Sequence, residues 1–133
     1  MTTLIARFSV TGWDPAPLAE LDLSGADDDW LGAITMRKTY SSGLVGESVA
    51  HFISSGTEAS RGYLAAERIT GTLDDGRSGS FTVHHGGSQV GDELTIFGSI
   101  IPGTGTDDFA GFAGAATIIH DADGPYFRFE LTD

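Results

Sequence analysis

The sequence predicts an all-β protein, either an up-and-down barrel or a β-sandwich. Eight short stretches alternate apolar with polar side chains, which is the period of a strand with one buried face. Clusters of Gly, Pro, Asp and Ser separate these stretches at steady intervals, and no stretch carries apolar residues at helical spacing. With 133 residues and 40% hydrophobic content the chain has the size of one domain, so residues 1–133 are expected to form a single unit.

The first expected strand covers residues 4–13. Leu4, Ala6 and Phe8 recur at every second position, so they share one face of this strand. The proline-containing run that includes Pro15 is expected to end the strand near Trp13, because proline donates no ladder hydrogen bond.

Two further strands follow a segment whose secondary structure the sequence does not decide. Residues 16–23 fit either a short helix or an edge strand, and residues 24–29 fit an acidic loop whose charges are solvated. The next strand is expected at residues 31–41, and the side chains that share one of its faces are Ile34, Met36, Lys38 and Tyr40. Another strand is expected at residues 44–54, where alternation alone does not decide which face points inward.

The centre of the chain, residues 62–87, predicts a β-hairpin. Residues 74–76, with the sequence Asp-Asp-Gly, have the chemistry of its turn. On the face that we expect to point inward, the two arms place Tyr63, Glu67, Phe81 and His85. A carboxylate, an imidazole and a phenol would then converge on an otherwise apolar interior.

The rest of the chain predicts a polar loop and three more strands. The loop is expected at residues 86–92, and the strands at residues 93–102, 115–120 and 126–131. Residues 102–114, PGTGTDDFAGFAG, form a glycine-rich connection. This tight connection is expected to let Phe109 and Phe112 fold under one end of the barrel.

A barrel of eight strands has an interior that is either filled by side chains or able to hold one small ligand. Small inward residues such as Ala65 would leave room for a ligand. The side chains expected to line that space are Phe8, Ala65, Phe81 and Val83.

The charge and composition exclude several classes of function. The formal net charge of −12 repels phosphate backbones and anionic membranes, so we expect no nucleic-acid partner and no membrane. The absence of cysteine excludes disulfides and cysteine nucleophiles. The start of the chain lacks the pattern of a signal peptide, and no stretch has the length of a membrane span. A cytoplasmic protein is therefore expected.

Metal and cofactor sites are not expected. The adjacent residues His84 and His85 point to opposite faces of a strand, and the other histidines, His51 and His120, lie far away in sequence. No phosphate-loop motif and no G-x-S-x-G nucleophile elbow occurs.

The candidate catalytic residues are Glu67, His85 and Tyr63. Glu67 and His85 would serve as general base and acid, with the pKa of Glu67 raised by burial, and Tyr63 would donate a hydrogen bond to a ligand oxygen. The competing interpretation is structural, and the pattern favours it. A buried glutamate needs a partner in any case, and Arg37, Arg68 or Tyr63 would supply one without any catalysis.

Two long runs of the sequence resemble the bacterial family of uncharacterised proteins known as DUF3224. In that family a GY-x-x-x-ER-x-x-GTL-DGRSGSF-x-x-x-H run precedes a PGSGT-x-x-L-x-G-x-x-G loop, and the matching positions here are residues 62–85 and 102–114. Thr104, Phe109 and Phe112 depart from the family pattern, and the turn of the hairpin holds one extra Asp. The resemblance covers nearly the whole chain.

The resemblance implies a fold and, by analogy, a kind of chemistry. The implied fold is a single eight-stranded antiparallel up-and-down barrel of the allene oxide cyclase-like type, and the Gly-Thr-Gly loop is also similar to that of plant dirigent proteins. Those relatives bind a hydrophobic reactive molecule inside the barrel and steer its cyclisation or coupling. Fold-level analogy does not establish activity, so the sequence leaves three functions open.

The first of these functions is a small-molecule-binding barrel that acts as a cofactor-independent cyclase or isomerase on a small hydrophobic substrate. The second is a non-catalytic carrier or sensor that uses the same cavity, and the third is a structural barrel with a filled interior. A homo-oligomer is also expected, because Trp13 and Trp30 are interpreted as exposed aromatic positions.

Overall fold

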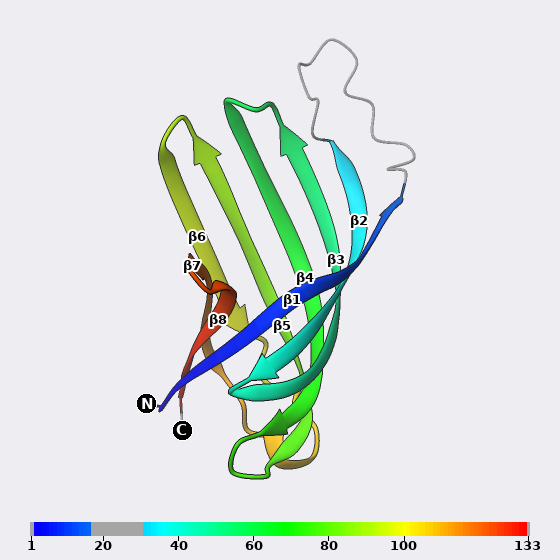
Figure 1. The fold of residues 1–133 in the computed structure, drawn as a ribbon, viewed down its shortest axis with the longest axis vertical. Helices are drawn as coiled ribbons and strands as arrows, with labels where there is room; N and C mark the ends of the chain where they lie inside the picture. The colour runs from blue at the N-terminus through cyan, green and yellow to red at the C-terminus, as the bar shows by residue number, and fades with distance from the viewer. Residues whose placement is uncertain (1, 17–30, 133) are drawn as a thin grey trace.

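Eight antiparallel strands close into a barrel in which each strand pairs with its neighbours in sequence and β8 pairs with β1 (Figure 1). The computed structural model describes residues 2–16 and 31–132 of the chain. The strands are β1 (Thr2–Ala16), β2 (Gly32–Ser42), β3 (Leu44–Gly56), β4 (Ser60–Leu73), β5 (Ser78–Val90), β6 (Glu93–Ile100), β7 (Gly114–Asp121) and β8 (Gly124–Leu131). The up-and-down barrel is confirmed, and the sandwich is excluded. The open interpretations of residues 17–30 lie outside the described residues.

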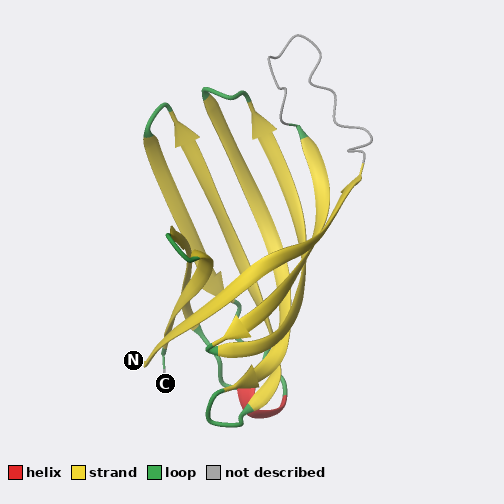
Figure 2. Ribbon diagram, in the orientation of Figure 1, coloured by secondary structure: helices red, strands yellow, loops and turns green. Residues whose placement is uncertain are grey.

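The barrel is fully paired at one end only. Strand β8 pairs with β1 over Thr2–Arg7, and β7 pairs with β6 only at Ser99 and Ile100. Beyond these points β1 pairs with β2 alone, and β6 pairs with β5 alone. Figure 2 shows the consequence, since the strands from β2 to β6 extend well past the short β7–β8 hairpin. The barrel therefore has a narrow closed end and a wide end.

Strand β1 is longer than expected. The strand was expected to end near Trp13, but it pairs with β2 as far as Ala16, with Pro15 opposite Ile34. Proline is tolerated here because this part of β1 has a pairing neighbour on one side only, and prolines in sheets occur on such edges.

Aromatic side chains fill the narrow end. A 3₁₀-helix, η1 (Asp107–Phe109), lies in the glycine-rich connection after β6 and carries the buried Phe109. Phe109 stacks on Phe112 with ring centroids 4.4 Å apart, and both contact the ring of Phe81 inside the barrel. The expectation that Phe109 and Phe112 fold under one barrel end is confirmed.

Burial settles the inward face of each central strand. In β3, Leu44, Ser48 and Ala50 are buried while Val45 and Glu47 are exposed, which resolves the face that alternation left open. In β4 and β5 the residues expected inside are buried, namely Glu67, Phe81 and His85. In β2 the buried face is the one that carries Met36, Lys38 and Tyr40.

Strand β5 is longer than expected, because the anticipated loop at residues 86–92 is mostly strand. A Cβ atom at Gly86 would lie 2.5 Å from the Phe97 ring, and one at Gly87 would lie 3.2 Å from the Tyr63 ring. Aromatic rings from the neighbouring strands thus pack directly on the β5 backbone. The two glycines mark close packing within a sheet rather than a turn.

Candidate functional site

Glu67 lies at the centre of the barrel and is completely buried. Its Oε1 atom accepts hydrogen bonds from Lys38 Nζ at 2.9 Å and from His85 Nε2 at 2.9 Å. Its Oε2 atom accepts from the Tyr40 hydroxyl at 2.7 Å and from the Ser48 hydroxyl at 2.6 Å. Strands β2, β3 and β5 therefore each supply donors to one carboxylate on β4, and both of its oxygens are fully satisfied.

These donors set the charge of the carboxylate. Burial raises the pKa of Glu67, but the hydrogen bond from His85, the charge of Lys38 and the hydrogen bond from Ser48 outweigh that effect and lower the pKa to about 2. The expected rise in the pKa of Glu67 is therefore wrong. An ionised carboxylate that already accepts four hydrogen bonds is a poor proton acceptor at neutral pH.

Lys38 is the counter-ion of Glu67, and the sequence analysis did not find it. Its ammonium group is buried and lies 4.1 Å from the centroid of the Phe8 ring and 5.0 Å from that of Phe127. Burial lowers the pKa of Lys38, and Glu67 opposes this effect. The arginines expected as partners, Arg37 and Arg68, are exposed instead. A lysine within the otherwise apolar face of the strand at residues 31–41 was the available signal.

His85 connects this buried cluster to Tyr63. The Tyr63 hydroxyl lies 3.2 Å from His85 Nδ1, and His85 Nε2 lies 2.9 Å from Glu67 Oε1. A neutral imidazole with its proton on Nε2 accepts from Tyr63 and donates to Glu67, so one tautomer satisfies both contacts. Burial, aided by the charge of Glu67, raises the pKa of Tyr63 to about 12, which keeps the phenol protonated.

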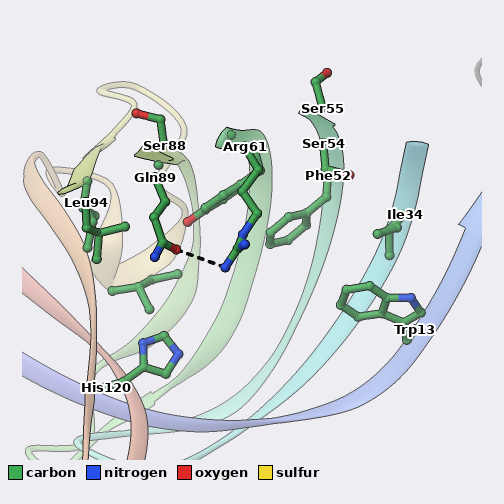
Figure 3. Close-up of a pocket in the computed structure, with 15 residues that line it drawn as sticks. Trp13, Ile34, Phe52, Ser54, Ser55, Arg61, Ser88, Gln89, Leu94 and His120 are labelled. Atoms are coloured by element: carbon green, nitrogen blue, oxygen red, sulfur yellow. Dashed lines mark hydrogen bonds between the residues drawn. The ribbon is translucent and has the colours of Figure 1, made fainter. Parts of the chain in front are cut away.

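A cavity of about 350 Å³ opens at the wide end of the barrel, above this cluster (Figure 3). Its lining residues are Trp13, Ile34, Phe52, Ser54, Ser55, Arg61, Gly62, Tyr63, Gly87, Ser88, Gln89, Leu94, Ile96, Ile118 and His120. Phe52 and Tyr63 stack with ring centroids 5.1 Å apart, and both rings also contact His85. This aromatic pair forms the floor that separates the cavity from the polar cluster below.

Trp13 reaches the cavity because β1 contains a β-bulge. Val10 pairs with Lys38 and Gly12 pairs with the next residue, Arg37, so Thr11 is an extra residue on β1. The bulge reverses the alternation and places Trp13 opposite the inward-facing Met36. Trp13 is exposed at the rim, but it lines the cavity, whereas Trp30 lies outside the described residues.

The candidate residues thus divide into three groups. Tyr63 lines the cavity, while His85 and Glu67 lie below its floor and are linked to Tyr63 by hydrogen bonds. The residues expected to line the ligand space do not line the cavity but belong to the core beneath it, and they are Phe8, Ala65, Phe81 and Val83. Periodicity identified the inward face of these residues correctly, but it does not tell how far along the barrel axis each side chain lies.

Residues 2–16 and 31–132 contain neither a metal-binding cluster nor a membrane-spanning helix. No group of three or more His, Asp or Glu side chains in this part of the chain is arranged to hold a metal ion. It likewise contains no helix with the length and apolar character needed to span a bilayer.

Comparison with known proteins places the chain in a family. The sequence profile of the family described as "Protein of unknown function (DUF3224)" matches residues 4–132. The chain belongs to the DUF3224 family. No curated protein matches the sequence of this DUF3224 chain.

A solved structure is similar to the DUF3224 chain in fold. It is the crystal structure of a protein of unknown function from the DUF3224 family of Shewanella oneidensis MR-1, with a TM-score of 0.84 and 23% sequence identity. The alignment covers 99% of this chain and 96% of that one. At this identity the likeness shows the fold alone. The likeness to allene oxide cyclases and dirigent proteins stays a prediction.

The geometry of the DUF3224 barrel restricts the chemistry that its cavity could support. Glu67 cannot meet a ligand directly, because Phe52 and Tyr63 lie between the buried cluster and the cavity. Proton transfer between a ligand and this cluster would therefore pass through the Tyr63 hydroxyl, which is hydrogen-bonded to His85. Glu67 would fix the tautomer of His85 and stabilise its charged form.

Proposed function

We propose that this DUF3224 protein binds a small, predominantly apolar molecule in the cavity at the wide end of its barrel. The observation that carries this proposal is the cavity of about 350 Å³ with mostly apolar walls, a volume near the lower end of the range of ligand sites. The aromatic side chains that fill the narrow end do not extend into this region. A structural barrel would be expected to fill both ends.

The exposed rim supports the same proposal. Leu94 is 62% exposed and Trp13 is 56% exposed, and both side chains line the cavity. Apolar surface that contacts water is unfavourable, and exposed apolar side chains gathered around a cavity mark ligand-binding sites. A bound apolar molecule would remove this surface from water and stabilise the protein.

The binding test uses the neutral fluorophore N-phenyl-1-naphthylamine. We expect saturable binding at one site per chain with a Kd on the order of 10 μM. Ile96→Arg puts a charge in the cavity wall and should weaken binding at least about tenfold. Thr95→Arg is the matched control, because it adds the same charge to the neighbouring exposed residue of β6, which does not line the cavity. Absence of saturable binding, or equal effects of the two variants, would contradict the proposal.

A second function, cofactor-independent isomerisation or cyclisation of the bound molecule, is favoured by the hydrogen-bonded chain from Tyr63 through His85 to Glu67. In such a reaction the Tyr63 hydroxyl takes a proton from the substrate as it passes its own proton to His85 Nδ1, so no free phenolate forms, and Glu67 stabilises the resulting imidazolium. Return of both protons, with the substrate proton going back to a different atom, completes an isomerisation without any co-reactant.

The variant Tyr63→Phe separates enzyme from carrier. If the second function holds, this change should lower turnover of an identified substrate by at least about a hundredfold and leave ligand affinity nearly intact. Glu67→Gln and His85→Ala should act in the same direction. Equal losses of affinity and turnover would leave binding as the function.

A further inference from the structure

The hydrogen bonds below the cavity floor have a fixed direction, and Glu67 sets it. Its pKa of about 2 keeps the carboxylate ionised at neutral pH, so both of its oxygens can only accept hydrogen bonds. His85 Nε2 lies 2.9 Å from Glu67 Oε1 and must therefore carry a proton. The opposite tautomer would place a nitrogen lone pair against a carboxylate oxygen, which is repulsive.

The charges of the buried cluster favour a neutral His85 ring. Lys38 Nζ lies 2.9 Å from Glu67 Oε1, so the one buried carboxylate in the described part of the chain already has a buried cation beside it. A second proton on His85 would add a positive charge to the core with no further anion to balance it, which is unfavourable. The ring therefore holds its proton on Nε2 and presents a lone pair on Nδ1.

This arrangement leaves Tyr63 as a hydrogen-bond acceptor toward the cavity. Its hydroxyl lies 3.2 Å from His85 Nδ1 and donates its single proton there, so only lone pairs remain for a ligand. The bond from Tyr63 to His85 is only partly buried, whereas the bond from His85 to Glu67 is fully buried. Tyr63 also lines the cavity, so the chain of hydrogen bonds meets a ligand at the Tyr63 oxygen. From the sequence, Tyr63 was expected to donate to a ligand oxygen, which is the opposite direction.

We propose that the ligand of this cavity is an apolar alcohol or phenol whose hydroxyl group donates a hydrogen bond to the Tyr63 oxygen. This inference rests on the proposed function and names the chemical class of its ligand. The apolar body of the ligand lies against side chains such as Leu94 and Ile96. A ligand carbonyl at the same place would face a lone pair of Tyr63 and find no donor there. His85 is a positioning residue, because it fixes the direction of the Tyr63 O–H bond.

The test compares 5-nonanol with 5-nonanone, which share one carbon skeleton, although only the alcohol has a hydrogen-bond donor. Each displaces the fluorophore N-phenyl-1-naphthylamine at pH 7.5. We expect the alcohol to bind at least about fivefold more tightly than the ketone. Tyr63→Phe should bring the two affinities close together by weakening the alcohol alone. Tyr126→Phe is the matched control, because it removes the same hydroxyl from a ring that packs under Arg7 and does not line the cavity, and it should keep the preference.

A second variant, His85→Leu, tests the direction of the hydrogen bond. It removes the acceptor of the Tyr63 proton, which is then free to reach a ketone oxygen, so the ketone should gain at least about threefold relative to the alcohol. A loss of packing alone would weaken both compounds alike.

Three results would overturn the inference. They are equal or reversed affinities of alcohol and ketone for the unmodified protein, a preference that survives Tyr63→Phe, and a preference that His85→Leu leaves unchanged. Each of these results leaves the proposed function standing, because the fluorophore and both compounds still bind. Failure of the fluorophore to bind would instead reject the proposed function and this inference together.

Discussion

Glu67 is ionised in the core because its partners compensate for the loss of water. A bare carboxylate in a dry interior is strongly unfavourable, so burial alone would protonate this side chain. Four hydrogen bonds and the charge of Lys38 reverse that balance. Removal of one partner from such a pair leaves an uncompensated buried charge, whereas removal of both charges is often close to neutral. The cluster therefore makes the fold sensitive to pH.

Acid should destabilise the protein through Glu67 between pH 4.5 and pH 2. The folded pKa of about 2 lies below the ordinary value of 4.5, so the unfolded chain binds more protons between these values. The stabilisation is fully present above pH 4.5 and is lost as the pH falls towards 2, a change of about 3 kcal/mol. Urea denaturation at several pH values between 2 and 6 measures the free energy of unfolding.

The reference for this measurement is the double variant Lys38→Met with Glu67→Gln, which lacks both buried charges. Asp75, Asp121 and Glu130 also have lowered pKa values, but none of their interaction partners belongs to the buried cluster, so they titrate alike in both proteins. The difference between the two pH profiles therefore isolates the buried pair. Parallel profiles would show that Glu67 is not held as a carboxylate.

At the scale of single strands, alternation was a reliable guide wherever a strand is regular. It found β2 and grouped Lys38 with Tyr40 on one face, because a period of two follows directly from strand geometry, but it did not decide that this face points inward. It could not find the bulge at Thr11, because one extra residue is defined by its pairing partner on β2 and leaves no local mark. Trp13 was correctly interpreted as exposed, but its place in the cavity lining was missed.

The end of β5 could not be predicted for a related reason. Gly86 and Gly87 look like loop residues in sequence, but each is covered by an aromatic ring from a neighbouring strand. The Phe97 ring lies over Gly86 and the Tyr63 ring lies over Gly87. Whether a glycine ends a strand or accommodates a ring depends on the partner strand, which the local sequence does not specify.

At the scale of the whole molecule, some residues of the site come from one hairpin and others come from strands distant in sequence. Tyr63, Glu67 and His85 lie on one hairpin, so their common face follows from the sequence of β4 and β5. Lys38 and Ser48 reach Glu67 only because β3 pairs with the hairpin and β2 pairs with β3 in the closed sheet. The depth of the cavity depends on where the short β7–β8 hairpin stops pairing, which is a property of the complete barrel.

This uneven closure should be visible in hydrogen exchange. Between Glu93 and Gly98, strand β6 pairs with β5 alone, whereas β4 pairs on both sides along its length. Amides of β4 between Tyr63 and Thr70 should therefore exchange about a hundredfold or more slowly than those of β6 between Glu93 and Gly98. Hydrogen–deuterium exchange with mass spectrometry measures both segments.

Addition of N-phenyl-1-naphthylamine should slow exchange in β6 and around Trp13, because a ligand in the cavity contacts both, and should leave the slow segment of β4 unchanged. Uniform slowing of all strands, or equal exchange in β4 and β6 without ligand, would show that the wide end is not the less stable part of the barrel.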